Sequence, residues 1–344
     1  MFNFLSNFIK IKKFEYKGES ILILLQKPLG LGDLVMLSPF VSLIEDKFKS
    51  KIFVVSEHKD FIEFKNIVWL KPEECSENLI KDAIVISPTL AFSHLKYIFK
   101  AKYFIGYFIS NKLISNFSKI SYTYNPKYEH YLLKTFIILD IFKIEYDKND
   151  LFYPAIKYNF LDLGIENYIV LAPYSNWKER QYPFNNYISL ISNLIQIYKI
   201  NIIFIGSNDL NEVAFNQQIE NKLNNPLIIN LTAKTSILQM NYIIKNSKCF
   251  IGNDSGPANI AYLIAKKSIV FFGSVDFENR LPLNSELKLN ILALDSRHEC
   301  KYFPCYDGYN KPDCENLDKY CCISKTFIIN KDLEFFLDIN LCAE

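Results

Sequence analysis

An acidic side chain lies where a glycine-containing loop leads from an apolar run into a segment of helical period. Gly30 and Gly32 precede Asp33 in this loop, and glycine lets a substrate approach the backbone closely. The helix dipole and capping favour a carboxylate in a first turn, which gives Asp33 an ordinary structural explanation. A well-positioned hydroxyl can also donate its proton to such a carboxylate. Asp33 is therefore a candidate general base. Gly30 and Gly32 would lie beside the bound acceptor, which is the substrate whose hydroxyl loses the proton.

A second loop, at residues 249–262, has the features of an anion-binding site. It runs from an apolar segment into a helix with Pro257 expected at the first helical position. Free backbone N–H groups at a helix N-terminus bind phosphate, and a carboxylate just before them can accept hydrogen bonds from sugar hydroxyls. An ordinary capped helix is the alternative explanation. The residues predicted to bind a nucleotide-sugar donor here are Asp254, Ser255, Gly256, Pro257 and Asn259.

Two cations follow the apolar run 168–172. Lys178 and Arg180 can neutralise the charge of a leaving diphosphate, although both can also be solvated surface charges. A later apolar run ends at Gly273, in a turn of small residues typical of phosphate-lined clefts. The sequence therefore predicts that Lys178, Arg180 and Gly273 contact the donor.

Five of the eight cysteines lie close together, at Cys300, Cys305, Cys314, Cys321 and Cys322. Four thiolates can hold zinc, but this spacing differs from the paired Cys-x2-Cys of a zinc ribbon. Disulfides are not expected without an export signal. The sequence favours a redox-labile loop, with bound zinc as the alternative. No metal or cofactor is expected.

The elements that must position these residues follow from alternating apolar runs and helix-period segments, the pattern of parallel sheets covered by helices. Strands are expected at 21–26, 52–56, 83–87, 103–108, 168–172, 201–205, 227–230, 249–252 and 268–272. Helices are expected at 33–48, 185–198, 210–223, 236–246 and 257–265. Ligands of such sheets bind beyond the carboxyl ends of the strands. Asp33, Arg180 and Asp254 all follow expected strands.

Length and composition indicate a globular protein of two domains. The 344 residues exceed the size at which one core keeps growing, and half of them are apolar. We expect an N-terminal domain at 1–155, a C-terminal domain at 156–330 and a helical tail at 331–344, with a hinge near 146–158. A net charge of +2 argues against a nucleic-acid binder. With no signal peptide or membrane span expected, the predicted location is the cytoplasm.

Several stretches together resemble the bacterial heptosyltransferases of glycosyltransferase family 9, over roughly residues 20 to 330. They are Gly32-Asp33-Leu34, Arg180-Gln181-Tyr182-Pro183, Leu-Thr-Ala-Lys-Thr-Ser at 231–236, Asn253-Asp254-Ser255-Gly256-Pro257 and Phe272-Gly273. The resemblance implies a GT-B fold, in which two Rossmann-like, doubly wound α/β domains face a central cleft. It places the acceptor mainly on the N-terminal domain and ADP-heptose mainly on the C-terminal domain.

The resemblance also implies inverting, metal-independent transfer of heptose to the inner core of lipopolysaccharide or lipooligosaccharide. Asp33 would be the general base, and Arg180 would replace the family's donor-phosphate lysine. Asn259 departs from the family's usual histidine and cannot carry a proton at neutral pH. A family-9-like transferase that uses another nucleotide sugar therefore stays an alternative, as does a sugar-binding protein that has lost activity.

A dinucleotide-dependent oxidoreductase is an alternative from a different class. Val35 weakens it, because a third glycine or alanine is expected there. Glu57 favours it, because that carboxylate can bind a ribose.

The implied acceptor is a lipid-linked core oligosaccharide at the inner face of the cytoplasmic membrane. Lys96 and Lys100 are four residues apart on one helical face, with Phe99 nearby. Such a face can bind acidic sugars or anionic headgroups and allow peripheral membrane contact, although a solvated helix edge is the alternative.

Overall fold

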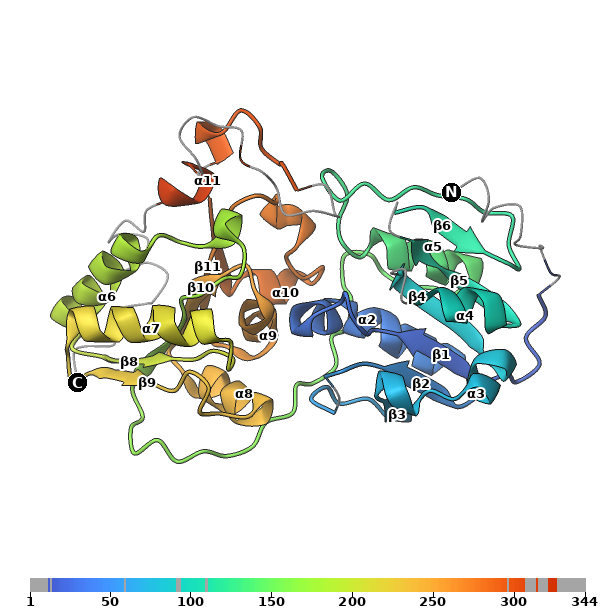
Figure 1. Cartoon of the computed structure of the whole chain (residues 1–344), viewed down its shortest axis with the longest axis horizontal. Helices are drawn as coiled ribbons and strands as arrows, with labels where there is room; N and C mark the ends of the chain where they lie inside the picture. Colours follow the sequence, from blue (N-terminus) through green and yellow to red (C-terminus); the bar gives the residue numbers. More distant parts are fainter. Residues whose placement is uncertain are drawn as a thin grey trace. The chain divides into compact units, whose positions relative to one another are not determined.

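The computed structural model divides into two compact units, Met1–Ala155 and Ile156–Glu344. This division lies between the same two residues as the boundary expected from the sequence. The structure describes residues 12, 14–58, 60–90, 94–108, 111–295, 297–306, 314 and 321–326. The expected helical tail at 331–344 lies outside the described residues. Each unit contains one sheet with helices packed against it (Figure 1).

The first unit is built on a six-stranded sheet of order β3-β2-β1-β4-β5-β6. Its strands are β1 (Ile21–Leu24), β2 (Ile52–Val55), β3 (Ile67–Leu70), β4 (Ile84–Leu90), β5 (Tyr103–Phe108) and β6 (Leu113–Ser115). Only the pairing of β5 with β6 is antiparallel among those described. The helices are α2 (Leu31–Lys47), α3 (Glu77–Asp82), α4 (Leu95–Lys100) and α5 (Leu133–Ile141), with a 3-10 turn η1 (Pro72–Glu74).

The second unit has a six-stranded sheet of order β12-β11-β10-β7-β8-β9, with every described pairing parallel. Its strands are β7 (Tyr168–Ala172), β8 (Asn201–Phe204), β9 (Ile228–Asn230), β10 (Cys249–Asn253), β11 (Ser268–Phe271) and β12 (Ile291–Leu294). The helices are α6 (Phe184–Tyr198), α7 (Leu210–Leu223), α8 (Ile237–Asn246), α9 (Gly256–Ile264), α10 (Ser285–Lys288) and α11 (Cys321–Ser324). Three 3-10 turns are η3 (Lys178–Arg180), η4 (Phe277–Asn279) and η5 (Arg297–Glu299).

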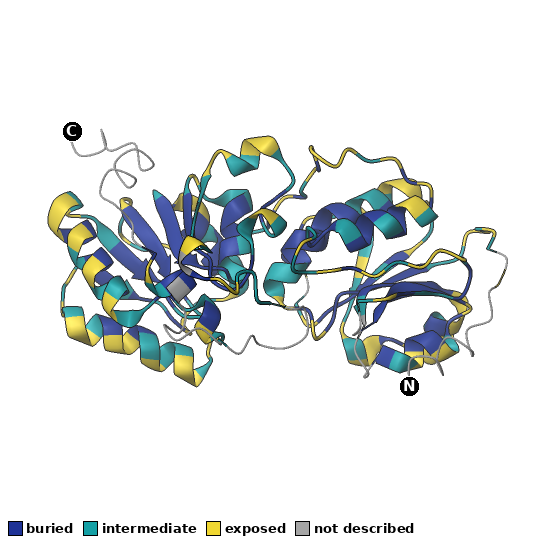
Figure 2. Ribbon diagram, turned by 90° about the horizontal axis from the view of Figure 1, so that it is seen from above, coloured by how far each residue is buried: buried dark blue, intermediate teal, exposed yellow. Residues whose placement is uncertain are grey.

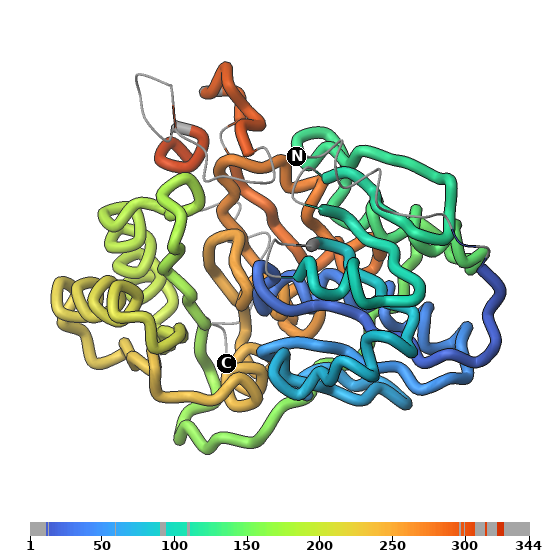
Figure 3. The backbone as a smooth tube through the Cα atoms, turned by 45° about the vertical axis from the view of Figure 1, so that its right-hand side comes forward, coloured from blue at the N-terminus to red at the C-terminus, as the bar shows by residue number. Residues whose placement is uncertain are grey.

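Both sheets reverse their strand order at one place, which fixes where a ligand can bind. In the first sheet β1 lies beside β4, and in the second β7 lies beside β10. At such a switch point the flanking crossovers run to opposite faces, which opens a crevice beyond the carboxyl ends of the two strands. Asp33 follows β1, Arg180 follows β7, and Asp254 follows β10. Figure 3 traces the backbone as a tube, coloured along the chain by residue number.

The cores explain why the central strands could be found from the sequence. Every residue of β1, β7 and β11 is buried, and central strands of parallel sheets read as continuous apolar runs. Figure 2 shows strands of both units in dark blue, with exposed residues on the helices and the connecting loops. The edge strands β3 and β12 are only partly buried. No helix in the described part of the chain is long and apolar enough to cross a membrane.

Candidate functional site

A candidate site in the first unit is centred on Asp33, the third residue of α2. The helix begins at Leu31, two residues earlier than expected, with Gly30 as its N-cap. The Gly30 N–H donates to Asp33 Oδ2 at 2.8 Å, which is the structural role expected of a first-turn carboxylate. Asp33 Oδ1 accepts a hydrogen bond from the Tyr131 hydroxyl at 2.6 Å. Each carboxylate oxygen has further acceptor capacity, and Asp33 is half-buried, so capping does not prevent it from accepting a proton.

Neighbouring strand ends hold the loop between β1 and α2. The carboxylate of Glu57, after β2, accepts the Lys27 backbone N–H at 3.1 Å. His94, after β4, is buried, and this burial lowers its pKa, although a hydrogen bond to the backbone of Lys27 opposes the shift. The Glu57 carboxylate therefore already binds the backbone of this loop, which weakens the prediction that it binds a ribose.

The two lysines predicted to contact the acceptor lie on the short helix α4. Lys100 forms an ion pair with Glu77 of α3, and its hydrogen bond lowers the pKa of Glu77. Lys96 is exposed, with its Nζ 4.9 Å from the centre of the Tyr97 ring. The Phe99 side chain beside them is 63% exposed. Lys96 is thus open to solvent while Lys100 is paired, and contact of either with an acceptor stays a prediction.

A separate candidate site, in the second unit, is formed where an ion pair joins the loops after β7 and β10. Arg180 Nη1 lies 3.3 Å from Asp254 Oδ2, with only 18% and 6% of the two side chains exposed. The guanidinium lies over the Trp177 ring, 4.3 Å from its centre, and 5.6 Å from the centre of the Tyr306 ring. The structure therefore brings together two of the predicted donor-binding residues and holds the cation on aromatic faces.

Asn253, the last residue of β10, connects the same two loops. Its side chain is completely buried; Nδ2 donates to the carbonyl of Pro173 at 2.9 Å, and Oδ1 accepts the backbone N–H of Tyr182 at 2.9 Å. These bonds fix both ends of the segment that carries Arg180. The buried amide thus positions the cation opposite Asp254.

The start of α9 differs in detail from the expectation. The helix begins at Gly256, so Pro257 is its second residue and not its first. Ser255 is the N-cap but its side chain makes no capping bond, while Asn259 Nδ2 donates back to the Ser255 carbonyl at 2.8 Å. Within the described residues, Ser255 Oγ and Arg180 Nε are buried polar atoms without a hydrogen-bond partner. Such atoms and an uncapped helix start are suited to bind an anionic ligand.

Lys178 and Gly273, the other two residues predicted to contact the donor, differ in their exposure. Lys178, the first residue of η3, is exposed, and its contact with a donor stays a prediction. Gly273 is buried after β11 and packs directly on η3. A Cβ atom added to Gly273 would lie only 1.6 Å from the Glu179 carbonyl oxygen. Glycine at this position therefore lets the backbone that carries Arg180 pass close to the sheet.

Gly273→Ala is expected to destabilise the second unit by about 2–3 kcal/mol, the upper part of the range for overpacking. The clash is with backbone atoms of Glu179, so η3 must move and donor affinity should fall as well. Gly206→Ala is the matched control, because its added Cβ meets the flexible end of the Glu212 side chain and should cost less than about 1 kcal/mol. Equal losses in denaturant unfolding of the two variants would contradict this explanation.

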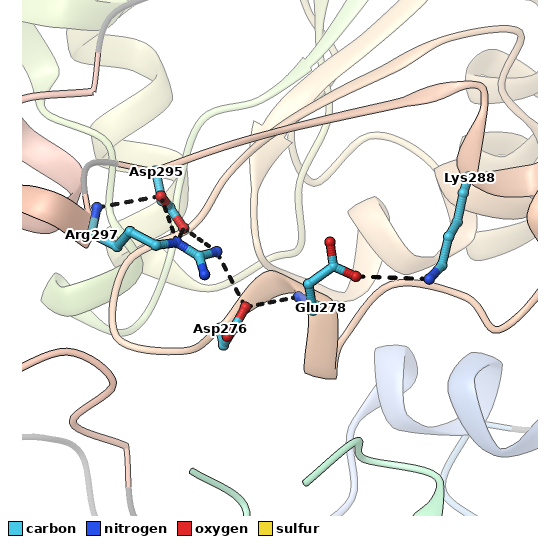
Figure 4. Close-up of polar contacts among 5 residues, drawn as sticks. All are labelled: Asp276, Glu278, Lys288, Asp295 and Arg297. Carbon is cyan, nitrogen blue, oxygen red and sulfur yellow. Dashed lines mark hydrogen bonds and ion pairs between the residues drawn. The ribbon is translucent and has the colours of Figure 1, made fainter. Parts of the chain in front are cut away.

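The loops after β11 and β12 are tied together by Arg297, at the start of η5 (Figure 4). Its guanidinium contacts both oxygens of Asp295, at 2.8 Å and 3.1 Å from Nε, and lies 3.2 Å from Asp276. The rings of Phe277 and Phe303 lie against it, 4.4 and 5.0 Å from the guanidinium carbon. Burial disfavours the charge, but the hydrogen bond and charge of Asp295 raise the pKa of Arg297. Arg297 therefore fixes two loops at the carboxyl edge of the sheet.

Arg297→Met should lower the free energy of unfolding by about 1–3 kcal/mol, because the Asp295 carboxylate, 7% exposed, would lose its paired cation. Arg297→Lys keeps the charge and should recover only part of the loss, since lysine lacks the planar fork. Thermal or urea unfolding measures both variants. Full stability of Arg297→Met would show that the two carboxylates do not need this cation.

The cysteine cluster is only partly described, because residues 307–313 and 315–320 lie outside the described ranges. Cys300 and Cys322 are buried and pack with Phe303. Burial, together with the nearby Cys300 and Cys314, raises the pKa of Cys305 to about 11. In the described part of the chain, no group of three His, Cys, Asp or Glu side chains is placed to hold a metal ion. The zinc alternative stays untested.

Several residues of the site were missed by the sequence interpretation. Trp177 lies three positions before Arg180, and an aromatic residue so close to a cation was a usable signal. Asn253 was recognised only as part of a motif, and its burial could not be read from the chain. Tyr131 is 98 residues from Asp33, and no sequence pattern connects the two.

Comparison with known proteins identifies related chains. The model of "Glycosyltransferase family 9 (heptosyltransferase)" matches residues 83–308, more than half of the chain. Lipooligosaccharide heptosyltransferase 2 of Campylobacter jejuni is 25% identical over 298 residues, covering 77% of this chain and 85% of that protein.

Two solved structures share the fold. The ADP-heptose lipopolysaccharide heptosyltransferase II of Escherichia coli superposes with a TM-score of 0.58 at 14% identity, covering 80% of this chain and 90% of that one. The iron-containing dodecameric glycosyltransferase TibC of enterotoxigenic E. coli gives a TM-score of 0.64 at 13% identity, covering 96% and 78%. With its two parallel-sheet α/β units, the chain has the GT-B fold predicted from the sequence.

Proposed function

Because the chain belongs to glycosyltransferase family 9, we propose that this glycosyltransferase moves heptose from ADP-heptose to the inner core of lipopolysaccharide or lipooligosaccharide. Two names support this choice: one relative is named a lipooligosaccharide heptosyltransferase, and one structural neighbour is named an ADP-heptose lipopolysaccharide heptosyltransferase. The observation that carries the proposal is the Arg180–Asp254 pair at the switch point of the second sheet, beside the uncapped start of α9.

The donor binds to the second unit in this proposal. The diphosphate interacts with Arg180, whose Nε has no described partner, and with backbone N–H groups at the start of α9. Asp254 accepts hydrogen bonds from the sugar. Lys178 adds positive charge from the surface, and Gly273 keeps the backbone of η3 close enough for these contacts. In the transition state the same cation stabilises the charge that develops on the leaving diphosphate.

The acceptor binds to the first unit, next to Gly30 and Gly32. Asp33 takes the proton of the attacking hydroxyl, and the hydroxyl oxygen bonds to the anomeric carbon from the face opposite the departing nucleotide. The bond between the anomeric carbon and the diphosphate oxygen breaks and ADP leaves; no metal ion takes part in this proposal, and the anomeric configuration inverts.

The acceptor's lipid anchor places the reaction at the cytoplasmic face of the inner membrane. Exposed Phe99 and Lys96 on α4 suit a peripheral contact with anionic headgroups.

A second candidate function is transfer from a different nucleotide sugar. Asn259 stands at the position of the family's usual histidine, and its amide is bonded to its own helix. This departure from the family's usual residue favours a donor with a different sugar. The dinucleotide alternative is less well supported, since Glu57 is bonded to the loop backbone.

Thermal unfolding in the presence of ADP-heptose, UDP-sugars or NAD tests the donor class. A ligand at 100 times its dissociation constant adds about 2.7 kcal/mol of stability, so ADP-heptose should give a clear rise in melting temperature and NAD should give none. A rise with a UDP-sugar alone would favour the second candidate, and a rise with NAD alone would contradict both.

Metal independence needs its own measurement, because the related TibC is named as iron-containing. Elemental analysis of protein purified without chelator shows whether a metal ion is bound. Turnover measured after chelation shows whether the reaction requires it. Unchanged turnover is expected, and a loss that added metal restores would overturn metal independence.

A further inference from the structure

Tyr131 forms the one side-chain hydrogen bond to Asp33 that the described residues show. Its hydroxyl donates to Asp33 Oδ1 at 2.6 Å, a short distance typical of a hydroxyl bonded to an ionised carboxylate. The other oxygen, Oδ2, is held by the Gly30 N–H. With one donor on each oxygen, the carboxylate plane is fixed from two directions.

The tyrosine is itself held by buried groups. Only 6% of Tyr131 is exposed, and it lies two residues before α5 in the chain. Lys134, 4% exposed, places its Nζ 4.1 Å from the centre of the Tyr131 ring. The same Nζ donates to Thr89 Oγ1 at 2.6 Å, and Thr89 belongs to β4, the strand that lies beside β1 at the switch point. The ring is thus supported by a cation that is bonded to the sheet.

We propose that Tyr131 is a positioning residue for catalysis, which orients the Asp33 carboxylate toward the acceptor hydroxyl. This inference rests on the proposed role of Asp33 as the base. The phenol uses one lone pair of Oδ1 and leaves the carboxylate a further one for the incoming proton. Lys134 keeps the ring in place, and a cation beneath the ring also makes the phenol a stronger hydrogen-bond donor.

Orientation matters because a general base works only within hydrogen-bond reach of the proton that it removes. Without the phenol, the carboxylate can rotate about its side-chain bonds while Oδ2 keeps the Gly30 bond. The acceptor and the donor bind through other groups, so their affinities do not depend on Tyr131. The loss should therefore appear in kcat and not in KM.

Tyr131→Phe is expected to lower kcat about tenfold, the effect of losing one hydrogen bond to a charged group, with KM for both substrates within about twofold of wild type. Tyr107→Phe is the matched control. It also removes a buried tyrosine hydroxyl from the first unit, one that has no hydrogen-bond partner among the described residues, and it should leave kcat unchanged. A wild-type kcat for Tyr131→Phe, or an equal loss in Tyr107→Phe, would overturn the proposal.

A double-mutant cycle with Asp33→Ala tests separately whether Asp33 is the general base and whether Tyr131 acts through it. If Tyr131 acts through Asp33, Tyr131→Phe should have no further effect on kcat in the Asp33→Ala background. A tenfold loss in both backgrounds would overturn the positioning role while leaving the base in place. Full turnover by Asp33→Ala itself would instead contradict the proposed function. Melting temperatures of all four proteins show that each is folded.

Discussion

Asp33→Asn should lower kcat by about two orders of magnitude or more, the usual scale for loss of a general base, while leaving the dissociation constant of the donor nearly unchanged. The amide is isosteric with the carboxylate, and its oxygen can still accept the Gly30 N–H that Asp33 Oδ2 accepts now. The amide nitrogen can donate to the Tyr131 oxygen, so the start of α2 should keep its structure. Steady-state turnover and calorimetric titration with donor measure the two quantities separately.

A melting temperature close to wild type is the control for this variant. If Asp33→Asn kept full turnover, Asp33 would not be the base, and its carboxylate would only cap α2. If turnover and donor affinity fell together, the variant would have disturbed more than proton transfer.

Arg180→Ala should weaken donor binding by about 10- to 100-fold, since a hydrogen bond to a charged group contributes about 1.5–3 kcal/mol. The substitution removes the cation that lies on Trp177 and 3.3 Å from Asp254. It also leaves the buried Asp254 carboxylate without its ion pair, which adds repulsion toward a diphosphate. Calorimetric titration with ADP-heptose and with ADP alone measures the loss, and the two ligands should be affected alike because they share the diphosphate.

Arg180→Lys distinguishes charge from shape in the same experiment. Lysine keeps the positive charge but lacks the planar, stacked fork of the guanidinium, so it should bind the donor with intermediate affinity. Wild-type affinity of Arg180→Ala would remove Arg180 from the donor site and leave its pair with Asp254 a structural contact.

Some elements could be predicted closely from the sequence, most of all fully buried strands, which read as continuous apolar runs. The strands at 168–172 and 103–108 and the helix at 210–223 were predicted with the bounds that the structure has. The edge strands β3 and β12 were missed, because short, partly exposed strands lack a long apolar run. The helix α5 was missed for another reason: it is apolar on most sides, so it shows no amphipathic period.

For the candidate site, the usable signal in the sequence was position on a strand-end loop. Asp33, Arg180 and Asp254 follow the strands at which each sheet reverses its order, and the pairing of Arg180 with Asp254 agrees with a common site in the second unit. The supporting contacts of Tyr131, Asn253 and Arg297 could not be predicted, since each joins segments that only the fold brings together.

The most direct measurement is the product formed by the wild-type enzyme from ADP-heptose and a truncated lipid-linked core acceptor. Release of ADP in equal amount to heptosylated acceptor, with the anomeric configuration inverted in the product's NMR spectrum, is the predicted result. Retention of configuration would contradict direct attack by a hydroxyl that Asp33 deprotonates. Folded protein that binds ADP-heptose yet transfers nothing to core acceptors, with or without added metal, would contradict the proposed reaction altogether.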